Sequence, residues 1–290
     1  MKIFSNFLPE IKYKQLIENL PKFKDKPITI FNDYIPSIQE LNINPINILI
    51  LNEPNEYFGH HIWAINNAHL FSLILTWSEL VLNNTSNSFL LPPAEKKLDD
   101  DYINTFNDNL EKKFEVNFLR GILNKVEGHS IRHKLFDLKN KITTSHIFWP
   151  VLDDFNWEQM SRPGDDKDGN SIWSEGKKQI WNRNSMFHIC IENTRHNNYY
   201  TEKIQDCFYT KTIPIYWGCP NIGDFWDEEG VIMIEDEKQA VELINNLTPE
   251  DYYKRLPHIE NNYKLALEKG CFYKRLELIL DKIIEINNIK

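Results

Sequence analysis

Short apolar runs alternate with stretches of helical periodicity along most of this chain, and this alternation constrains the fold more than any other feature. Strands are expected at 27–31, 46–51, 72–76 and 89–91, and again at 114–119, 145–150, 187–191, 212–217 and 231–234. Helices are expected at 13–20, 60–70, 129–139, 200–210, 238–246, 249–267 and 272–286. Strands that alternate with helices favour parallel sheets covered by helices. We therefore predict an α/β fold.

A polar, Asp-rich stretch at 92–111 separates the two sets of strands and is typical of a linker between domains or of a long surface excursion. It predicts two Rossmann-like domains, residues 1–110 and 111–290, that face an interdomain cleft. Such folds bind ligands between domains and at the carboxyl ends of parallel strands. A second polar stretch, 153–185, predicts either a lid over a ligand or a surface insertion. It contains three tryptophans and a lysine pair: Trp157, Trp173, Trp181 and Lys177-Lys178.

The charge of the chain argues against nucleic-acid binding. Lys and Arg number 33 against 42 Asp and Glu, a net charge of -9, and no basic stripe is present. No window approaches the ~18 apolar residues of a membrane span, and the first residues lack the apolar core of a signal peptide. The four cysteines form no CxxC pair. We expect a cytoplasmic protein with buried thiols and no structural metal.

The polar residues that best fit a ligand site lie in 187–218. An apolar strand runs into Glu192 and Asn193, and an Asn-rich loop then leads to a helix that opens near Thr201-Glu202-Lys203. A helix N-terminus at a strand's carboxyl end presents N–H groups and a positive dipole to an anion. Lys203 adds a charge, Glu202 suits ribose hydroxyls, and Tyr199 offers a ring or a phenol. These residues suit a nucleoside diphosphate; equally, Thr201 could simply cap a helix.

The same segment resembles the nucleotide-sugar motif of family 10 glycosyltransferases, the α-1,3/α-1,4-fucosyltransferases. Three stretches match in one register: Ile191-Glu192-Asn193, Tyr199-Tyr200-Thr201-Glu202-Lys203 and Ile213-Pro214-Ile215-Tyr216-Trp217-Gly218-Cys219-Pro220. Cys219 departs from the family by separating the Gly from the Pro. The resemblance is strong over 114–235, patchy over 46–92 and absent over 1–40.

The resemblance implies a GT-B architecture and an inverting, metal-independent transfer of fucose, or a related sugar, from a GDP-sugar to a hydroxyl of a glycan acceptor. Arg132 matches an Arg that contacts the phosphate of the sugar donor. Residues implied to bind the sugar donor are Arg132, Glu192, Asn193, Tyr199, Thr201, Glu202 and Lys203. No Asp-x-Asp pair ends a strand in a way that suits a metal, so cations and the helix dipole must stabilise the leaving diphosphate.

The resemblance also places the general base in the first half of the chain. Glu53 follows the apolar run 46–51, and Asn52-Glu53-Pro54 is similar to the family segment that carries the base. Glu56, His60 and His61 are alternatives. Two other functions remain open: a retaining, exostosin-like GT-B transferase that uses another nucleotide sugar and lacks a base at Glu53, and a nucleotide- or carbohydrate-binding protein without turnover.

Overall fold

The computed structural model describes residues 1–5, 21–23, 25–93, 111–121, 123–149, 184–270 and 272–286. Its contacts divide the chain into two compact units. Unit 1 comprises Met1–Glu95, His196–Tyr199 and Phe272–Lys290; unit 2 comprises Lys96–Arg195 and Tyr200–Cys271. The domain boundary predicted at residue 110 assigns one continuous run of sequence to each domain. In the division by contacts, unit 1 also contains two later segments, His196–Tyr199 and Phe272–Lys290.

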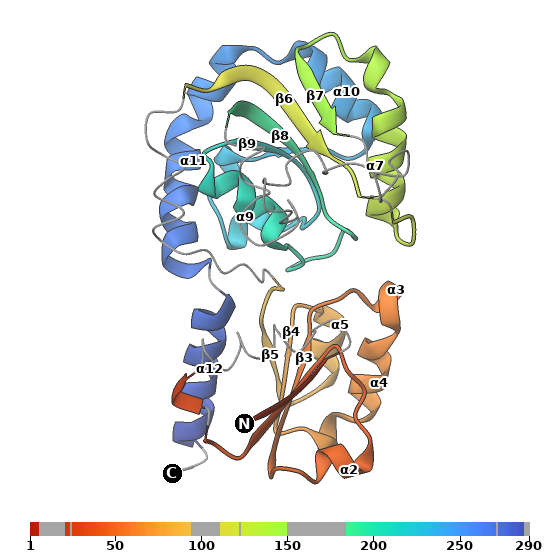
Figure 1. The fold of residues 1–290 in the computed structure, drawn as a ribbon, viewed down its shortest axis with the longest axis vertical. Coiled ribbons are helices and arrows are strands. Elements are labelled where there is room, and N and C mark those ends of the chain that lie inside the picture. Colours follow the sequence, from red (N-terminus) through yellow and green to blue (C-terminus); the bar gives the residue numbers. More distant parts are fainter. Residues whose placement is uncertain are drawn as a thin grey trace, which may run out of the picture. The chain divides into compact units, whose positions relative to one another are not determined.

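Unit 1 is built on a parallel sheet of five strands in the order β1-β2-β3-β4-β5 (Figure 1). The strands are β1 (Lys2–Ser5), β2 (Ile28–Asn32), β3 (Ile46–Leu51), β4 (Leu73–Thr76) and β5 (Ser88–Leu90). All six residues of the central strand β3 are buried, as expected for a parallel strand covered on both faces. The four strands predicted in this half are confirmed to within one residue, and β1 was not predicted.

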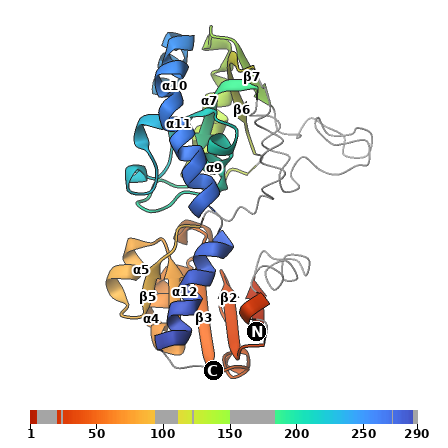
Figure 2. The ribbon, with the colours of Figure 1, turned by 90° about the vertical axis from the view of Figure 1, so that its left-hand side faces the viewer.

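Short helices connect the strands of unit 1. They are α2 (Ile38–Leu41), α3 (Asn55–Phe58), α4 (His60–Asn66) and α5 (Glu79–Asn84), with a 3-10 turn at Ala68–Leu70 after α4. The predicted helix 60–70 is thus confirmed as two pieces, and the predicted helix 13–20 lies outside the described residues. Helix α12 (Phe272–Ile286) lies beside the sheet (Figure 2). Leu276 and Leu280, one turn apart, form its buried stripe.

Unit 2 contains a second parallel sheet in the order β10-β9-β8-β6-β7. Its strands are β6 (Lys113–Leu119), β7 (His146–Trp149), β8 (Ser185–Ile191), β9 (Ile213–Trp217) and β10 (Ile232–Met233). The chain moves from β6 outward to β7 and then returns to β8 on the other side of β6. This reversal of strand order makes the carboxyl ends of β6 and β8 a topological switch point, the place where such folds bind ligands.

The helices of unit 2 form two packed pairs. Helix α9 (Glu202–Tyr209) packs against α11 (Pro249–Lys269), and α7 (Glu127–Asp137) packs against α10 (Glu237–Asn246). These helices and the five strands agree with the predicted ranges to within about two residues at most ends, because their apolar periodicity is strong. The predicted strand and helix order therefore holds throughout the described part of unit 2.

Three further expectations concern the chain as a whole. Cys190, Cys207 and Cys219 are free and buried, as expected, whereas Cys271 lies outside the described residues. Among the described segments, no helix combines the length and the apolarity that crossing a bilayer requires. Most of the polar stretch 153–185, including its tryptophans and its lysine pair, also lies outside the described residues.

Candidate functional site

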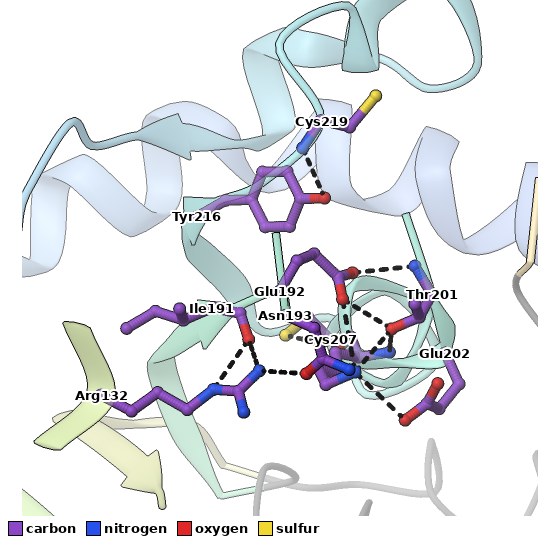
Figure 3. Close-up of polar contacts among 10 residues, drawn as sticks. Arg132, Ile191, Glu192, Asn193, Thr201, Glu202, Cys207, Tyr216 and Cys219 are labelled. Carbon is purple, nitrogen blue, oxygen red and sulfur yellow. Dashed lines mark hydrogen bonds and ion pairs between the residues drawn. The ribbon is translucent and has the colours of Figure 1, made fainter. Parts of the chain in front are cut away.

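A buried carboxylate organises the residues that follow β8. The side chain of Glu192, directly after the strand, is 0% exposed. It accepts two hydrogen bonds from Thr201, at 2.8 Å from the backbone N–H and 2.8 Å from Oγ1 (Figure 3). Thr201 in turn caps α9 by accepting from the N–H of Lys203. Glu192 therefore fixes the first turn of α9 at the carboxyl end of β8, although the sequence alone shows no link between the two.

Lys203 brings a positive charge to this first turn. Its Nζ donates to Thr201 Oγ1 at 2.9 Å and lies 3.3 Å from Glu192 Oε2 and 3.7 Å from Glu202 Oε1. Burial alone lowers the pKa of Lys203, but the carboxylates of Glu202 and Glu192 outweigh burial and raise it. The ammonium group is therefore charged at neutral pH. Its side chain is 28% exposed, so it combines internal pairing with access from solvent.

Arg132 joins α7 to the same strand end. It is 8% exposed, and its Nε and Nη2 both donate to the carbonyl of Ile191. Nη2 also donates to Asn193 Oδ1 at 3.1 Å. Figure 3 shows Arg132 and Glu192 on either side of the strand end, with Asn193 between them. The five predicted residues Arg132, Glu192, Asn193, Thr201 and Lys203 are thus brought into one bonded cluster, with Glu202 at its edge.

A glycine that the sequence did not single out permits this close packing. The N–H of Gly128, in the first turn of α7, donates to the carbonyl of Asn193 at 2.9 Å. A Cβ at position 128 would lie 1.8 Å from the Glu192 carbonyl oxygen. Only glycine allows the helix to approach the strand end this closely. In the sequence, Gly128 could have been noticed because it lies four residues before Arg132.

A cavity of about 140 Å³ opens at the switch point of unit 2. Phe118 and Leu119 line it from β6, Ile189–Ile191 from β8, and Arg132, Lys203 and Asp206 from the helices. Its volume is close to the ~150 Å³ of an engineered cavity that binds a benzene-sized ring. Lys203, in the first turn of α9, and Arg132, from α7, outnumber Asp206, the one acidic side chain among the described residues that line the cavity, so the cavity suits an anionic ligand.

Tyr199 is the remaining residue of the predicted donor-binding set. It falls in the segment His196–Tyr199, which groups with unit 1. Its side chain is 1% exposed, and its ring centroid lies 4.7 Å from that of Trp77. Asn198, with a left-handed φ of 64°, donates to the Trp77 carbonyl at 3.3 Å. The buried ring of Tyr199 therefore packs on an aromatic ring of unit 1.

Glu53 lies where the sequence predicts it, at the carboxyl end of β3 in unit 1. Side chains from other segments hold the backbone of this bend. Asp33 Oδ1 accepts from the N–H groups of Asn52 and Glu53, at 2.9 and 3.0 Å. Trp77 Nε1 donates to the Asn52 carbonyl at 3.0 Å, and His61 Nε2 lies 3.1 Å from the Glu53 carbonyl. Glu53 itself is half-buried, and its charge adds to burial in raising the pKa of Tyr57.

The alternatives to Glu53 differ in their surroundings. His61 is 2% exposed, and burial lowers its pKa to about 4. Since a carbonyl can only accept, His61 Nε2 carries a proton and donates to Glu53. Burial also lowers the pKa of His60, whose ring stacks on Phe58. Glu56 is exposed, with Oε1 2.9 Å from His196 Nε2.

In the described segments, the structure contains no group of three or more His, Cys, Asp or Glu side chains arranged to hold a metal ion. The carboxylates near the start of α9 are instead occupied by Thr201 and Lys203. The cations that these carboxylates accompany, Lys203 and Arg132, line the cavity at the same strand end.

Comparisons with known proteins test the predicted family. Residues 166–263 match the family model described as glycosyltransferase family 10 (fucosyltransferase), C-terminal part. The alpha-(1,3)-fucosyltransferase FucT of Helicobacter pylori is 38% identical over 77 residues, which make up 27% of this chain and 15% of that protein. The predicted resemblance to family 10 is confirmed. The family 10 match includes β8, the first turn of α9 and β9, which carry the cluster around Glu192.

Solved structures test the predicted fold. A crystal structure of an alpha1,3-fucosyltransferase with GDP-fucose gives a TM-score of 0.56 at 16% identity, covering 98% of this chain and 89% of that one. A UDP-forming trehalose-phosphate synthase from Burkholderia xenovorans gives 0.59 at 10% identity, covering 97% and 80%. The predicted α/β, GT-B-like fold is confirmed. Because a UDP-forming enzyme matches equally well, the fold does not identify the nucleotide.

Proposed function

We propose that this chain is a glycosyltransferase that moves fucose from GDP-fucose to a hydroxyl of a glycan acceptor, with inversion and without a metal. The observation that carries the proposal is the cluster of Arg132, Asn193, Glu192, Thr201 and Lys203 at the switch point of unit 2. The cluster combines a cationic cavity with a segment that matches family 10. The choice of GDP-fucose as the sugar donor rests on the match of residues 166–263 to the fucosyltransferase family model, because the fold alone does not identify the nucleotide.

The leaving group determines what the sugar-donor site must do. When the bond between C1 of the sugar and the phosphate oxygen breaks, negative charge grows on the diphosphate. Lys203, Arg132 and the positive end of the α9 dipole can stabilise this charge without a metal. Glu192 holds Lys203 and Thr201 in place, while Glu202, also in the first turn, is proposed to bind the ribose. Asn193 and Tyr199 complete the set of residues proposed to bind the sugar donor. The ring of Tyr199 is held in place by its packing on Trp77.

Glu53 is the proposed base. Its carboxylate takes the proton of the acceptor hydroxyl while the hydroxyl oxygen forms a bond to C1. The electron pair of the broken C1–O bond leaves with GDP, and the product has the opposite anomeric configuration from the donor. Glu53 is favoured over the neutral His61, which is already engaged as a donor to the Glu53 carbonyl.

Nucleotide binding tests the sugar donor. Calorimetric titration of the full chain with GDP, UDP and CMP should show GDP binding most tightly, and GDP should raise the melting temperature most. Tighter binding of UDP would favour the open alternative, a GT-B transferase that uses another nucleotide sugar, and would remove the assignment of GDP.

Turnover tests the reaction. GDP-fucose should be consumed in the presence of a panel of mono- and disaccharide acceptors, and NMR of the product should show an inverted anomeric centre. Activity should survive EDTA. Loss with EDTA that Mn²⁺ restores would contradict metal independence, and a retained configuration would favour an exostosin-like mechanism. Binding of GDP-fucose without any turnover would indicate a binding protein.

A further inference from the structure

The bend after β3 is held in an unusual way, because side chains rather than neighbouring strands bind its backbone. Four consecutive polar groups, the N–H and C=O of Asn52 and of Glu53, each have a side-chain partner. Asp33 follows the end of β2, and Trp77 follows the end of β4. The residues just beyond both neighbours of β3 thus fix the residues just beyond β3.

We infer that Asp33 and His61 are positioning residues, which orient Glu53 by holding the two peptide groups that flank it. Asp33 is 3% exposed, and one oxygen, Oδ1, receives both N–H groups. His61 is 2% exposed and donates to the next carbonyl along the chain. Together they fix both ends of residue 53, and Pro54 restricts its backbone further.

The backbone of Asp33 adds an independent observation. Its φ is 46°, in the left-handed region that few residues other than glycine adopt. Asp tolerates this region better than most side chains, yet glycine would fit it without cost. A glycine there would lose the Oδ1 acceptor. Asp33 thus adopts a backbone conformation that is costly for most residues, and its side chain supplies the acceptor for the Glu53 N–H. The carboxylate gives a reason for Asp rather than Gly at this position.

His61 is suited to the same task because it is held in one tautomer. Its ring meets the Trp77 ring edge-on, with centroids 5.3 Å apart and planes at 67°. Trp77 in turn donates to the Asn52 carbonyl. The charged or titratable groups that face His61 are Glu56, His60 and His196. The ring therefore has two packed neighbours, Trp77 and the Glu53 backbone, that fix its orientation.

The role of Asp33 and His61 rests on the proposed function, because both act only through Glu53. The variants Asp33→Ala and His61→Phe remove one hydrogen-bonding group each, and Asp33→Asn keeps an acceptor oxygen. We expect Asp33→Ala to lower kcat for GDP-fucose transfer about ten- to a hundredfold, because small displacements of a catalytic group cost this much. KM for GDP-fucose should stay unchanged, His61→Phe should lose less, and Asp33→Asn should retain most of the activity.

Combination with Glu53→Gln separates positioning from general loss of structure. If Asp33 acts through Glu53, Asp33→Ala should cause no further loss when residue 53 is already Gln. Asn47→Ala is the matched control: Asn47 is 8% exposed and donates to the Leu41 carbonyl at 2.9 Å, at the amino end of the same strand. It should lower stability without lowering kcat. Additive losses in the double variant would overturn the role of Asp33.

Backbone exchange provides a readout that does not need turnover. Hydrogen exchange of the Asn52 and Glu53 amides should accelerate in Asp33→Ala relative to Asn47→Ala, and unchanged exchange would overturn the assignment. The two hypotheses also fail separately. Wild-type activity in Glu53→Gln would remove the proposed base, whereas an inactive Glu53→Gln beside a fully active Asp33→Ala would remove only the positioning role.

Discussion

The Glu53 bend in unit 1 and the start of α9 in unit 2 both lie at the carboxyl end of a central parallel strand, but they are held by different means. In unit 2, the proposed ligand-binding side chains themselves hold the site together: Glu192 accepts from Thr201 and Lys203, and Arg132 donates to the Ile191 carbonyl. In unit 1, side chains hold the backbone that carries Glu53. In unit 2, support and proposed ligand binding are therefore properties of the same groups. In unit 1, the proposed base and its support belong to different residues.

This difference predicts how each region responds to substitution. A substitution in the unit 2 cluster should alter stability and ligand binding together. Glu192 and Lys203 both stabilise the first turn of α9, and their opposite charges determine the net charge of the site. A change of the Glu53 side chain should alter chemistry alone, since Asp33 and His61 bind its main-chain atoms. Four experiments, from the largest expected effect to the smallest, test this separation.

Glu53→Gln should have the largest effect. The variant keeps the size of the side chain and removes its basicity, so turnover should fall about 10²–10⁴-fold near neutral pH. GDP affinity and thermal stability should match the wild type. The loss should shrink at high pH, where the acceptor hydroxyl needs less help. Glu56→Gln, three residues further on, is the control and should stay active; the reverse pattern would identify Glu56 as the base.

Glu192→Ala should come next and should affect stability. Removal of the carboxylate leaves Lys203 without one of its two carboxylate neighbours and Thr201 without its acceptor. We expect a loss of about 2–4 kcal/mol in the free energy of unfolding, measured with urea, together with loss of GDP binding. The control is Glu202→Gln at the edge of the cluster, which should cost under ~1 kcal/mol. Unchanged stability in Glu192→Ala would contradict the view that this carboxylate organises α9.

Lys203→Ala should have a smaller effect on turnover than Glu53→Gln. Loss of a charged contact to phosphate costs roughly 1.5–3 kcal/mol, or about ten- to a hundredfold. Lys211→Ala is a matched control in unit 2, because Lys211 has similar exposure, 31%, and lies 3.5 Å from Glu260. Activity of Lys203→Ala equal to that of Lys211→Ala would exclude Lys203 from the site.

The contrast between the regions also explains what the sequence could predict. Glu192, Thr201 and Lys203 lie within twelve consecutive positions, and their apolar strand and helix have clear periodicity, so one segment showed both the elements and the candidate residues. The backbone of Asn52 and Glu53 is held by His61, eight positions from Glu53, and by Asp33 and Trp77, which are 19–25 positions away. Side-chain contacts over such separations depend on strand order, which periodicity does not specify. The inward direction of the Glu192 side chain was likewise not predictable from composition.

Backbone features were the least accessible to sequence reasoning. The left-handed φ of Asp33 and the 1.8 Å approach that excludes a Cβ at Gly128 follow from packing between segments. The return of α12 to unit 1 has the same origin, because its amphipathic pattern shows one buried face but not the sheet that covers it. Burial of Tyr199 against Trp77 is a further contact between distant positions.

Per pH unit and per histidine, acid should produce the smallest effect, and it tests whether a buried neutral histidine destabilises each of the two units at low pH. Burial lowers the pKa of His61 in unit 1 to about 4 and that of His188 in unit 2 to about 3. The unfolded chain therefore takes up a proton near pH 6.5, before the folded one does, so stability is complete above about 6.5 and falls as the pH decreases. Between pH 6.5 and 5 each histidine should contribute a slope approaching about 1.4 kcal/mol per pH unit.

Urea unfolding at several pH values between 7 and 5 measures these slopes. His61→Gln and His188→Gln should each flatten the pH dependence, although each also loses some stability at pH 7. His188 contacts Asn117 in unit 2 and lines the same cavity as Lys203. With a pKa of about 3 it is neutral in the folded protein above pH 5, so His188→Gln should leave the pH dependence of kcat unchanged even where it changes the size of kcat. His61→Gln should alter both profiles, because the Glu53 backbone depends on it. A kcat profile that responds to His188 as strongly as to His61 would show that the proposed base is not separately supported in unit 1.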